Sequence, residues 1–201
     1  NVLIQNASTI GLIDLGLMTN KTNNEISFFK KLETNAYELL YLLKSDNLNF
    51  TKKNEFIIYQ GSHGDKGAEI ADIILPSASY TEQNELFINL EGRVQECRKA
   101  NYPPGYAKED KQILNLLSKE IFDKNLYNSS IDLRDEILKK VKNFSEIGSL
   151  PLFNENIKTK SINQYDESKI IIKNIDYYFS NAIARSSKTM SMCRIERNDN
   201  L

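Results

Sequence analysis

Residues 55–76 read EFIIYQGSHGDKGAEIADIILP, and this stretch decides the fold class. It holds two apolar runs, at 55–60 and 72–75, that are rich in β-branched and aromatic side chains, as strands are. A glycine-rich loop and a short helical stretch at 68–71 separate them, and Pro76 stops the second run. Short apolar strands that alternate with helical or turn segments are typical of a parallel α/β sheet.

The sequence on both sides extends this pattern. Residues 37–43 predict a further buried strand, which ends at the polar turn 45–47. Residues 77–106 predict an irregular segment with short β pieces near 86–88. Apolar residues at helical spacing then predict two helices. The first stripe comprises Ile113, Leu114, Leu117 and Ile121, and the second comprises Leu133, Ile137, Val141 and Phe144, with Ser129 and Asp132 resembling a capping box.

The last third of the chain predicts less regular structure. Residues 145–168 are polar and predict a linker or surface loop, and residues 169–173 predict a strand. Residues 180–193 predict one helix capped by Ser180, and residues 194–201 predict a frayed, charged end. We divide the chain into an α/β part at 1–122 and a helical and loop extension at 123–201.

Composition excludes several classes of protein. The 201 residues have 26 basic and 27 acidic side chains, so no net positive field draws the chain to nucleic acid. The apolar runs are only a few residues long, whereas a membrane span needs about twenty. Two cysteines and one histidine are too few for an all-cysteine iron–sulfur or zinc site. Apolar residues at the very start of the sequence predict that part of the fold lies before residue 1.

The loop at residues 61–67 is the strongest motif for chemistry, and it has two interpretations. As a phosphate cradle, Gly61, Gly64 and Gly67 would let backbone N–H groups approach an anion, and Lys66 would add charge. As a tight turn between strand and helix, the same glycines would supply a positive φ. Its spacing matches neither common nucleotide-binding pattern. The second interpretation is the one we favour.

Other side chains in this region also have two interpretations. Asp65 either binds a ribose hydroxyl or caps the following helix. His63 is either a general base or metal ligand, or a surface or turn residue, and we favour the latter because no cysteine is near it. Four charged residues lie close in sequence at Glu82, Glu85, Glu91 and Arg93. Paired carboxylates can do acid–base work, but we interpret Glu91 and Arg93 as a structural or interface ion pair.

The sulfur-containing side chains give little support for catalysis. Cys97 stands beside Arg98, which favours a thiolate, but no histidine partner is near it in the sequence. We predict that Cys193 is buried packing and that Met190 and Met192 are core or interface residues. From the residues alone, the chain is a soluble α/β domain with helical extensions and no self-sufficient active site.

A resemblance takes the sequence further. Residues 57–82, together with Asn89-Leu-Glu-Gly-Arg-Val-Gln at 89–95, Pro-Pro-Gly at 103–105 and Ala-Lys-Glu-Asp at 107–110, resemble the large iron–sulfur subunit of respiratory complex I. The Ala-Asp-Ile-Ile-Leu-Pro element at 71–76 and the Asn-x-Glu-Gly-Arg element are similar to those across molybdopterin oxidoreductases. The resemblance implies a partial, Rossmann-like molybdopterin-oxidoreductase domain, from the C-terminal portion of that subunit.

What the resemblance implies about function is specific. The chain would be a non-catalytic structural part of the matrix arm of mitochondrial NADH:ubiquinone oxidoreductase, peripheral on the matrix side of the inner membrane. Its partners would be other matrix-arm subunits and a separate, cysteine-rich N-terminal part of the same subunit. It would bind no cofactor itself, while iron–sulfur clusters, FMN and NADH would bind elsewhere in the complex.

The resemblance also leaves an enzymatic alternative. Related molybdopterin enzymes bind a pterin dinucleotide, and the alternative is a fragment of such an oxidoreductase whose loop still holds it. Under the main hypothesis Gly61, Gly64, Asp65 and Gly67 form a relic of that site. Residues 44–46 read Lys-Ser-Asp where the family pattern leads us to expect Gly-Ala-Asp, which would hinder close backbone approach to a dinucleotide.

Overall fold

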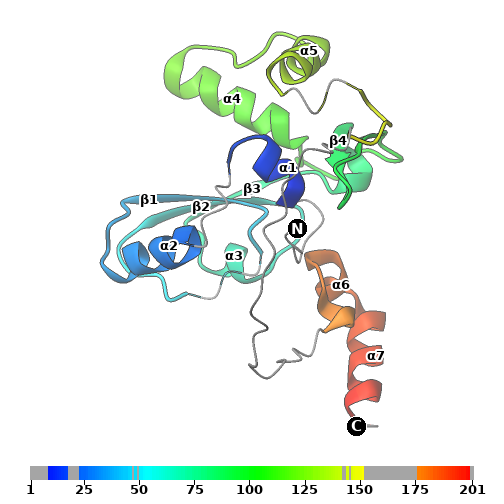
Figure 1. The fold of residues 1–201 in the computed structure, drawn as a ribbon. Coiled ribbons are helices and arrows are strands. Elements are labelled where there is room, and N and C mark those ends of the chain that lie inside the picture. The colour runs from blue at the N-terminus through cyan, green and yellow to red at the C-terminus, as the bar shows by residue number, and fades with distance from the viewer. Residues whose placement is uncertain are drawn as a thin grey trace, which may run out of the picture. The chain divides into compact units, whose positions relative to one another are not determined.

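The computed structural model describes residues 9–17, 23–46, 48, 50–141, 144, 146–151 and 176–199 (Figure 1). The chain forms two compact units, Asn1–Pro151 and Leu152–Leu201. A parallel sheet with helices in the first unit confirms the α/β fold class. The domain division at residues 122/123 stays a prediction.

Three parallel strands form the sheet of the first unit. They lie in the order β1 (Leu39–Leu43), β2 (Phe56–Gly61) and β3 (Ile73–Pro76), and all three were predicted. The register pairs Leu39 with Phe56 and Ile58 with Ile73. Since all three strands run parallel, their carboxyl ends meet at one edge of the sheet.

A short helix, α3 (Lys66–Glu69), lies in the connection between β2 and β3. Its first residue is Lys66 rather than Ala68, because the Asp65 carboxylate accepts a hydrogen bond from the Lys66 backbone N–H at 2.8 Å. The capping interpretation of Asp65 is therefore confirmed, and the helix begins two residues earlier than predicted.

The hydrophobic core lies on one face of the sheet. Helix α2 (Asn23–Glu33) and α3 lie on the same side of the sheet (Figure 1). The buried side chains of this core are Leu32 of α2, Leu40 and Leu42 of β1, and Ile57 and Tyr59 of β2. Full burial of one such aliphatic side chain stabilises a fold by about 1.5–3 kcal/mol.

An antiparallel hairpin follows the sheet. Its strands are β4 (Glu85–Ile88) and β5 (Val94–Cys97), preceded by the 3₁₀ turn η1 (Tyr80–Glu82). Helix α1 (Thr9–Asp14) packs on β4, where a Cβ atom at Gly11 would lie 3.1 Å from Ile88 Cδ1. The sequence predicted β4 but missed β5.

Two helices complete the described part of the first unit. Helix α4 (Asp110–Phe122) and helix α5 (Ser130–Lys140) occur near their predicted places. The predicted stripe of the second helix is too long, because Val141 ends α5 with an extended ψ of 97° and leaves Val141 and Phe144 outside the helix. The Ser129 cap is confirmed, because its Oγ accepts a hydrogen bond from the Asp132 backbone N–H at 3.1 Å. In the predicted apolar stripe of α4, Ile113 is buried. Ile121 belongs to the same stripe but is 66% exposed, so it lies outside the core.

The second unit, within residues 176–199, contains the 3₁₀ turn η3 (Tyr177–Phe179), α6 (Ala182–Ser186) and α7 (Lys188–Asp199). Arg194 joins them, since its Nε lies 2.6 Å from Asp176 Oδ2 and its guanidinium stacks on the Phe179 ring.

The predicted single helix at 180–193 is wrong in two respects. Asn181, not Ser180, caps α6 by accepting from the Ala184 N–H at 2.9 Å, and Ser187 interrupts the helix with an extended ψ of 120°. Helix α7 then continues through the charged residues 194–199, which were predicted to fray. The strand predicted at 169–173 lies outside the described residues.

Candidate functional site

The loop at residues 61–67 lies at the carboxyl edge of the sheet, where open α/β folds bind ligands. Tyr59 of β2 fills the inside of this loop. Its hydroxyl donates a hydrogen bond to the Asp46 carboxylate and lies 3.0 Å from the His63 carbonyl oxygen. The Tyr59 side chain is 1% exposed, so its ring is part of the core and also the floor of the loop.

Two of the three glycines in the loop, Gly61 and Gly67, allow this close approach of Tyr59. A Cβ atom at Gly61 would lie 2.1 Å from the Tyr59 hydroxyl oxygen, and one at Gly67 would lie 2.7 Å from the Ser45 carbonyl oxygen and 2.8 Å from the Tyr59 ring. A Cβ atom at Gly64 would meet nothing within 4 Å. No residue from 61 to 67 has a positive φ. The loop is a tight turn, but the expectation that its glycines supply a positive φ is wrong.

His63 is a half-exposed turn residue. Its Nδ1 lies 3.0 Å from the Ser62 hydroxyl, and its carbonyl oxygen faces Tyr59. This confirms the interpretation of His63 as part of the turn.

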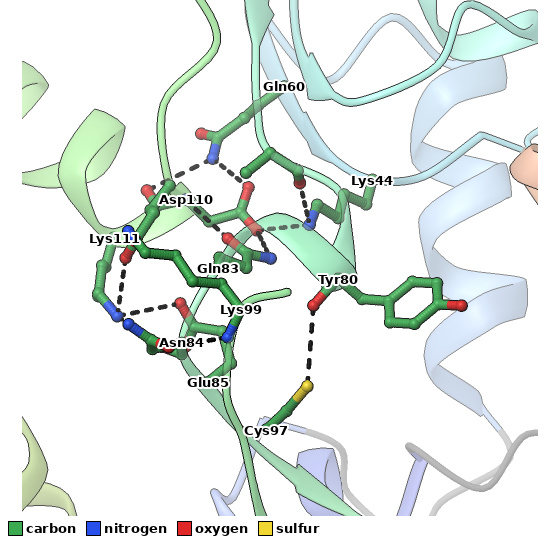
Figure 2. Close-up of polar contacts among 12 residues, drawn as sticks. Lys44, Gln60, Tyr80, Gln83, Asn84, Glu85, Cys97, Lys99, Asp110 and Lys111 are labelled. Atoms are coloured by element: carbon green, nitrogen blue, oxygen red, sulfur yellow. Dashed lines mark hydrogen bonds and ion pairs between the residues drawn. The ribbon is translucent and has the colours of Figure 1, made fainter. Parts of the chain in front are cut away.

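Lys44 occupies the neighbouring position at the carboxyl edge, directly after β1. Its backbone is left-handed, with φ at 51°, although it is not a glycine. The Nζ atom lies 2.6 Å from Asp110 Oδ2 and donates to the Ala78 carbonyl oxygen at 3.1 Å (Figure 2). The side chain therefore spans from the end of β1 to the start of α4.

Asp110, the first residue of α4, collects hydrogen bonds from two further side chains. Gln60 Nε2 donates to Asp110 Oδ1 at 2.8 Å, and Gln83 Nε2 donates to Asp110 Oδ2 at 3.0 Å (Figure 2). The Asp110 N–H donates to Gln83 Oε1 at 3.1 Å. We call Lys44, Gln60, Gln83 and Asp110 the Asp110 cluster. Tyr41 extends it by donating to Gln60 Oε1.

The electrostatics of the Asp110 cluster favour the charged carboxylate. Burial by itself would raise the pKa of Asp110, but the hydrogen bonds from Lys44 and Gln83 and the charge of Lys44 lower that pKa below its usual value. Burial, and then the negative charge of Asp110, raises the pKa of Tyr41. The cluster is thus a negative charge at a helix N-terminus, neutralised by one lysine.

A second charged group lies beside it, around Lys111. The Lys111 Nζ atom lies 3.1 Å from Glu109 Oε2 and 3.4 Å from Glu85 Oε1, and it donates to the Asn84 carbonyl oxygen at 2.6 Å (Figure 2). Burial raises the pKa of Glu85 despite this lysine. A groove of about 290 Å³ opens here between β4, β5, α4 and α5. Its charged groups Glu85, Lys111, Glu96 and Arg134 pair with one another.

The carboxylates predicted near each other have separate roles. Glu82 accepts a hydrogen bond from the Ser79 N–H at 2.9 Å and so caps η1. Glu91 and Arg93 form no ion pair with each other, so the predicted pair is wrong. Both belong to the turn between β4 and β5, where Asn89 Oδ1 accepts from the N–H groups of Glu91 and Arg93 at 3.0 and 2.9 Å. Gly92 completes the turn with a φ of 82°.

The two cysteines lie in different environments. Cys97 is partly exposed, with Sγ 3.8 Å from the Tyr80 carbonyl oxygen (Figure 2). Cys193 is exposed, so its predicted burial is wrong, and Met190 and Met192 beside it are also exposed. Within the described residues, no three His, Cys, Asp or Glu side chains are grouped to hold a metal ion. None of the helices in the same ranges is long and apolar enough to cross a membrane.

Sequence reasoning missed most of the Asp110 cluster. Lys44 was noted only because it replaces an expected glycine, and Asp110 only as the last residue of the Ala-Lys-Glu-Asp element at 107–110. The available signal was Gln60, an amide at the end of an otherwise apolar strand. A buried amide requires hydrogen-bond partners, and those of Gln60 come from Tyr41 and Asp110.

Comparison with known proteins gives consistent matches. The chain is 36% identical to the NADH-ubiquinone oxidoreductase 75 kDa subunit of Reclinomonas americana, over 96% of the chain and 28% of the relative. It is 40% identical to an NADH-quinone oxidoreductase subunit of Rickettsia bellii, over 96% of the chain and 27% of the relative. It is 35% identical to the mitochondrial NADH-ubiquinone oxidoreductase 78 kDa subunit of Candida albicans, again over 96% of the chain and 27% of the relative.

These relatives agree with the resemblance read from residues 57–121, and the chain spans about a quarter of their length. The molybdopterin oxidoreductase family matches residues 1–120, which include the sheet, the glycine loop, the hairpin and most of α4. The chain therefore belongs to the molybdopterin oxidoreductase family.

Proposed function

We propose that this chain is a non-catalytic structural part of the matrix arm of mitochondrial complex I. The assembled complex would transfer electrons from NADH to ubiquinone and couple this transfer to proton pumping. The support is the similarity of 96% of the chain to subunits whose names place them in NADH–quinone oxidoreductases. The chain would scaffold the iron–sulfur-bearing part of the subunit, peripherally on the matrix side of the inner membrane.

The observation that carries the structural role is the filled carboxyl edge of the sheet. A dinucleotide at this edge needs space inside the glycine loop and a helix N-terminus open to phosphate. Here the Tyr59 ring lies against Gly61 and Gly67, and the N-terminus of α4 carries the carboxylates of Glu109 and Asp110. The residues present therefore do not fit a pterin dinucleotide, and we derive no catalytic step at this edge.

The enzymatic alternative makes a distinct prediction. A fragment of a molybdopterin-dependent oxidoreductase would carry molybdenum or tungsten and release a fluorescent pterin on oxidation. In that case, the Tyr59 side chain would have to leave the loop and Lys44 would have to release Asp110. Both groups have hydrogen-bond partners in the fold, which favours the structural role.

The proposed partners are those that the resemblance to the large complex I subunit implies. They are the other matrix-arm subunits and a cysteine-rich part of the same subunit that holds the iron–sulfur clusters. FMN and NADH would bind elsewhere in the assembly.

Mass spectrometry of native-gel bands from mitochondrial membranes tests the proposal. We expect peptides of this chain in the band that stains for NADH dehydrogenase activity, together with peptides of the cysteine-rich part. Its presence only at low mass, away from that activity, would contradict the proposal. Stoichiometric molybdenum in the purified chain would establish the enzymatic alternative instead.

A further inference from the structure

Residues 98–108 form a surface loop whose two ends are fixed to one part of the fold, and we call them the tyrosine loop. After β5, the Ala100 N–H donates to the Thr81 carbonyl oxygen at 2.8 Å. At the other end, the Ala78 N–H donates to the Lys108 carbonyl oxygen at 2.8 Å. Compact loops of about 6–16 residues with neighbouring ends are frequently functional. This loop contains the Pro-Pro-Gly motif, which the proposed function leaves without a role.

The tyrosine side chains of this region lie in solvent. Tyr106 is 93% exposed and Tyr102 is 76% exposed. Tyr80, which lies beside the loop, is 54% exposed, and its ring points away from the Asp110 cluster (Figure 2). A turn presents Tyr106 outward, and it is closed by the Ala107 N–H, which donates to the Pro104 carbonyl oxygen at 3.1 Å. The fold therefore holds large aromatic rings in place without burying them.

The tyrosine loop is also basic. Its charged side chains are Arg98, Lys99 and Lys108, and it contains no acidic residue. The Lys99 Nζ atom lies 3.5 Å from Glu109 Oε1 and 4.9 Å from the centre of the Tyr102 ring. Arg98 and Lys108 are exposed, and neither forms an ion pair with a residue that the structure describes. The whole chain has a net charge of -1, so this positive charge is a local feature.

The exposed rings and the unpaired cations define the chemistry of a partner. Tyrosine and arginine are enriched where separately folded chains meet, and their side chains carry much of the binding energy there. Cations without partners around such rings complement carboxylates on the other surface. An anionic lipid surface would gain only about 1 kcal/mol from each cation, and the loop has only two that are unpaired. These properties favour an acidic protein surface over a membrane.

We propose that the tyrosine loop docks on an acidic surface of a neighbouring subunit in the matrix arm of complex I. This inference rests on the proposed function and names a contact between this chain and another polypeptide. Tyr106 would fill a pocket on that subunit, and Arg98 and Lys108 would pair with its Asp or Glu side chains. Because Pro103 and Pro104 restrict the backbone, the loop loses less conformational entropy when it docks.

Photo-cross-linking in the assembled complex tests this contact. The photoreactive amino acid p-benzoylphenylalanine replaces Tyr106, which is aromatic and exposed, so the fold should tolerate it. The matched control carries the same residue at Phe122, which is 73% exposed and lies at the end of α4. After irradiation, cross-linked peptides are identified by mass spectrometry in the native-gel band with NADH dehydrogenase activity.

We expect position 106 to cross-link to a different subunit, at a segment rich in Asp and Glu, and position 122 not to reach that segment. Cross-links from position 106 only to lipid, to a second copy of the chain, to the same subunit or to a segment without acidic residues would overturn the inference. So would equal cross-linking from position 122, or no cross-link in a band that contains the chain. If the unmodified chain is absent from that band, the proposed function itself fails, which the unirradiated gel shows independently.

A charge reversal gives a second measurement. Lys108→Glu changes a side chain but keeps the backbone hydrogen bond from Ala78, so the loop should stay attached to the fold. As salt is raised, we expect the variant to lose the cross-linked subunit from the active band several-fold more than wild type does. Lys124→Glu is the matched control, because Lys124 is an exposed lysine outside the loop, and it should behave like wild type. Equal retention of that subunit by both variants would contradict the inference.

Discussion

Lys44 has a left-handed backbone conformation that is unfavourable for any residue with a Cβ atom. Its side chain compensates through Asp110 and the Ala78 carbonyl oxygen. A pair of variants distinguishes the backbone strain from the side-chain contacts. Lys44→Ala loses the contacts and keeps the strain, whereas Lys44→Gly loses the contacts and relieves it. We expect the glycine variant to be more stable than the alanine variant by about 1 kcal/mol, measured by urea unfolding. Equal stabilities would contradict the strained conformation.

Gly67 is a position where a single methyl group should destabilise the fold. Its Cβ atom would meet the Ser45 carbonyl oxygen and the buried Tyr59 ring, neither of which is a flexible side-chain end. We expect Gly67→Ala to lower the free energy of unfolding by about 1–3 kcal/mol, as overpacked sites do. Gly64→Ala is the control, and its effect should be neutral or slightly stabilising because its Cβ atom would have open space. The reverse order in thermal unfolding would rule out this account of the loop.

At the scale of elements, the turn between β4 and β5 depends on Asn89. The Asn89 side chain accepts hydrogen bonds from two backbone N–H groups. We expect Asn89→Ala to destabilise the protein by about 1 kcal/mol and to increase amide hydrogen exchange in β4 and β5. Glu91→Ala removes a carboxylate that accepts one exposed hydrogen bond from Asn89 Nδ2 at 3.2 Å but leaves both backbone bonds to Asn89 Oδ1 in place, so it should change exchange little. Faster exchange in the Glu91 variant alone would restore the predicted Glu91–Arg93 pair.

The elements that the sequence predicts best are those with a strong local pattern. The three parallel strands, α4 and α5 each combine apolar periodicity with a clear end, such as Pro76 or Ser129. Strand β5 was missed because Val-Gln-Glu-Cys is short and mostly polar, and it becomes a strand only by pairing with β4.

The second unit shows a different limit of local patterns. Ser180 and Asn181 are both good capping residues. Ser180 ends η3 with a helical backbone, so the extended Asn181 becomes the cap of α6.

At the scale of the whole molecule, stability should depend on pH through Asp110. Because its pKa is lowered in the folded state, this carboxylate stabilises the fold at pH values above its unfolded pKa, and the stabilisation is lost as pH falls through the folded value. We expect the free energy of unfolding to decrease below about pH 4, and to decrease less in Asp110→Asn. Around neutral pH this variant should be less stable by about 1.5–3 kcal/mol, because charged hydrogen bonds are lost.

Two comparisons isolate Asp110 in that experiment. The raised pKa of Glu85 has the opposite sign, since its charged form is disfavoured by folding. Burial is the main cause of that shift and persists in the variant, whereas the loss of the Asp110 charge removes a lesser cause. Asp123→Asn removes an exposed i,i+4 partner of Lys119 and should change stability little. Parallel pH curves for wild type and Asp110→Asn would exclude a role for Asp110 in acid stability.

The candidate site was only partly predictable, and the reason is distance along the chain. The glycine loop and its turn residues are local, so the sequence located them. The Asp110 cluster joins residues that no local pattern connects, since Gln60 and Gln83 lie 50 and 27 positions before Asp110. Its partners become visible only when the sheet, the hairpin and α4 are assembled.

The same separation has a kinetic consequence. The parallel sheet assembles from consecutive strands within residues 39–76. The contacts of Asp110 join residues farther apart in sequence and so close larger loops. Where local contacts form first in folding, these contacts form later. Contacts that form after the transition state affect mainly the unfolding rate. In stopped-flow experiments, Asp110→Asn should therefore accelerate unfolding and leave refolding nearly unchanged. The contact between Lys44 and Asp110 would then lengthen the lifetime of the folded chain.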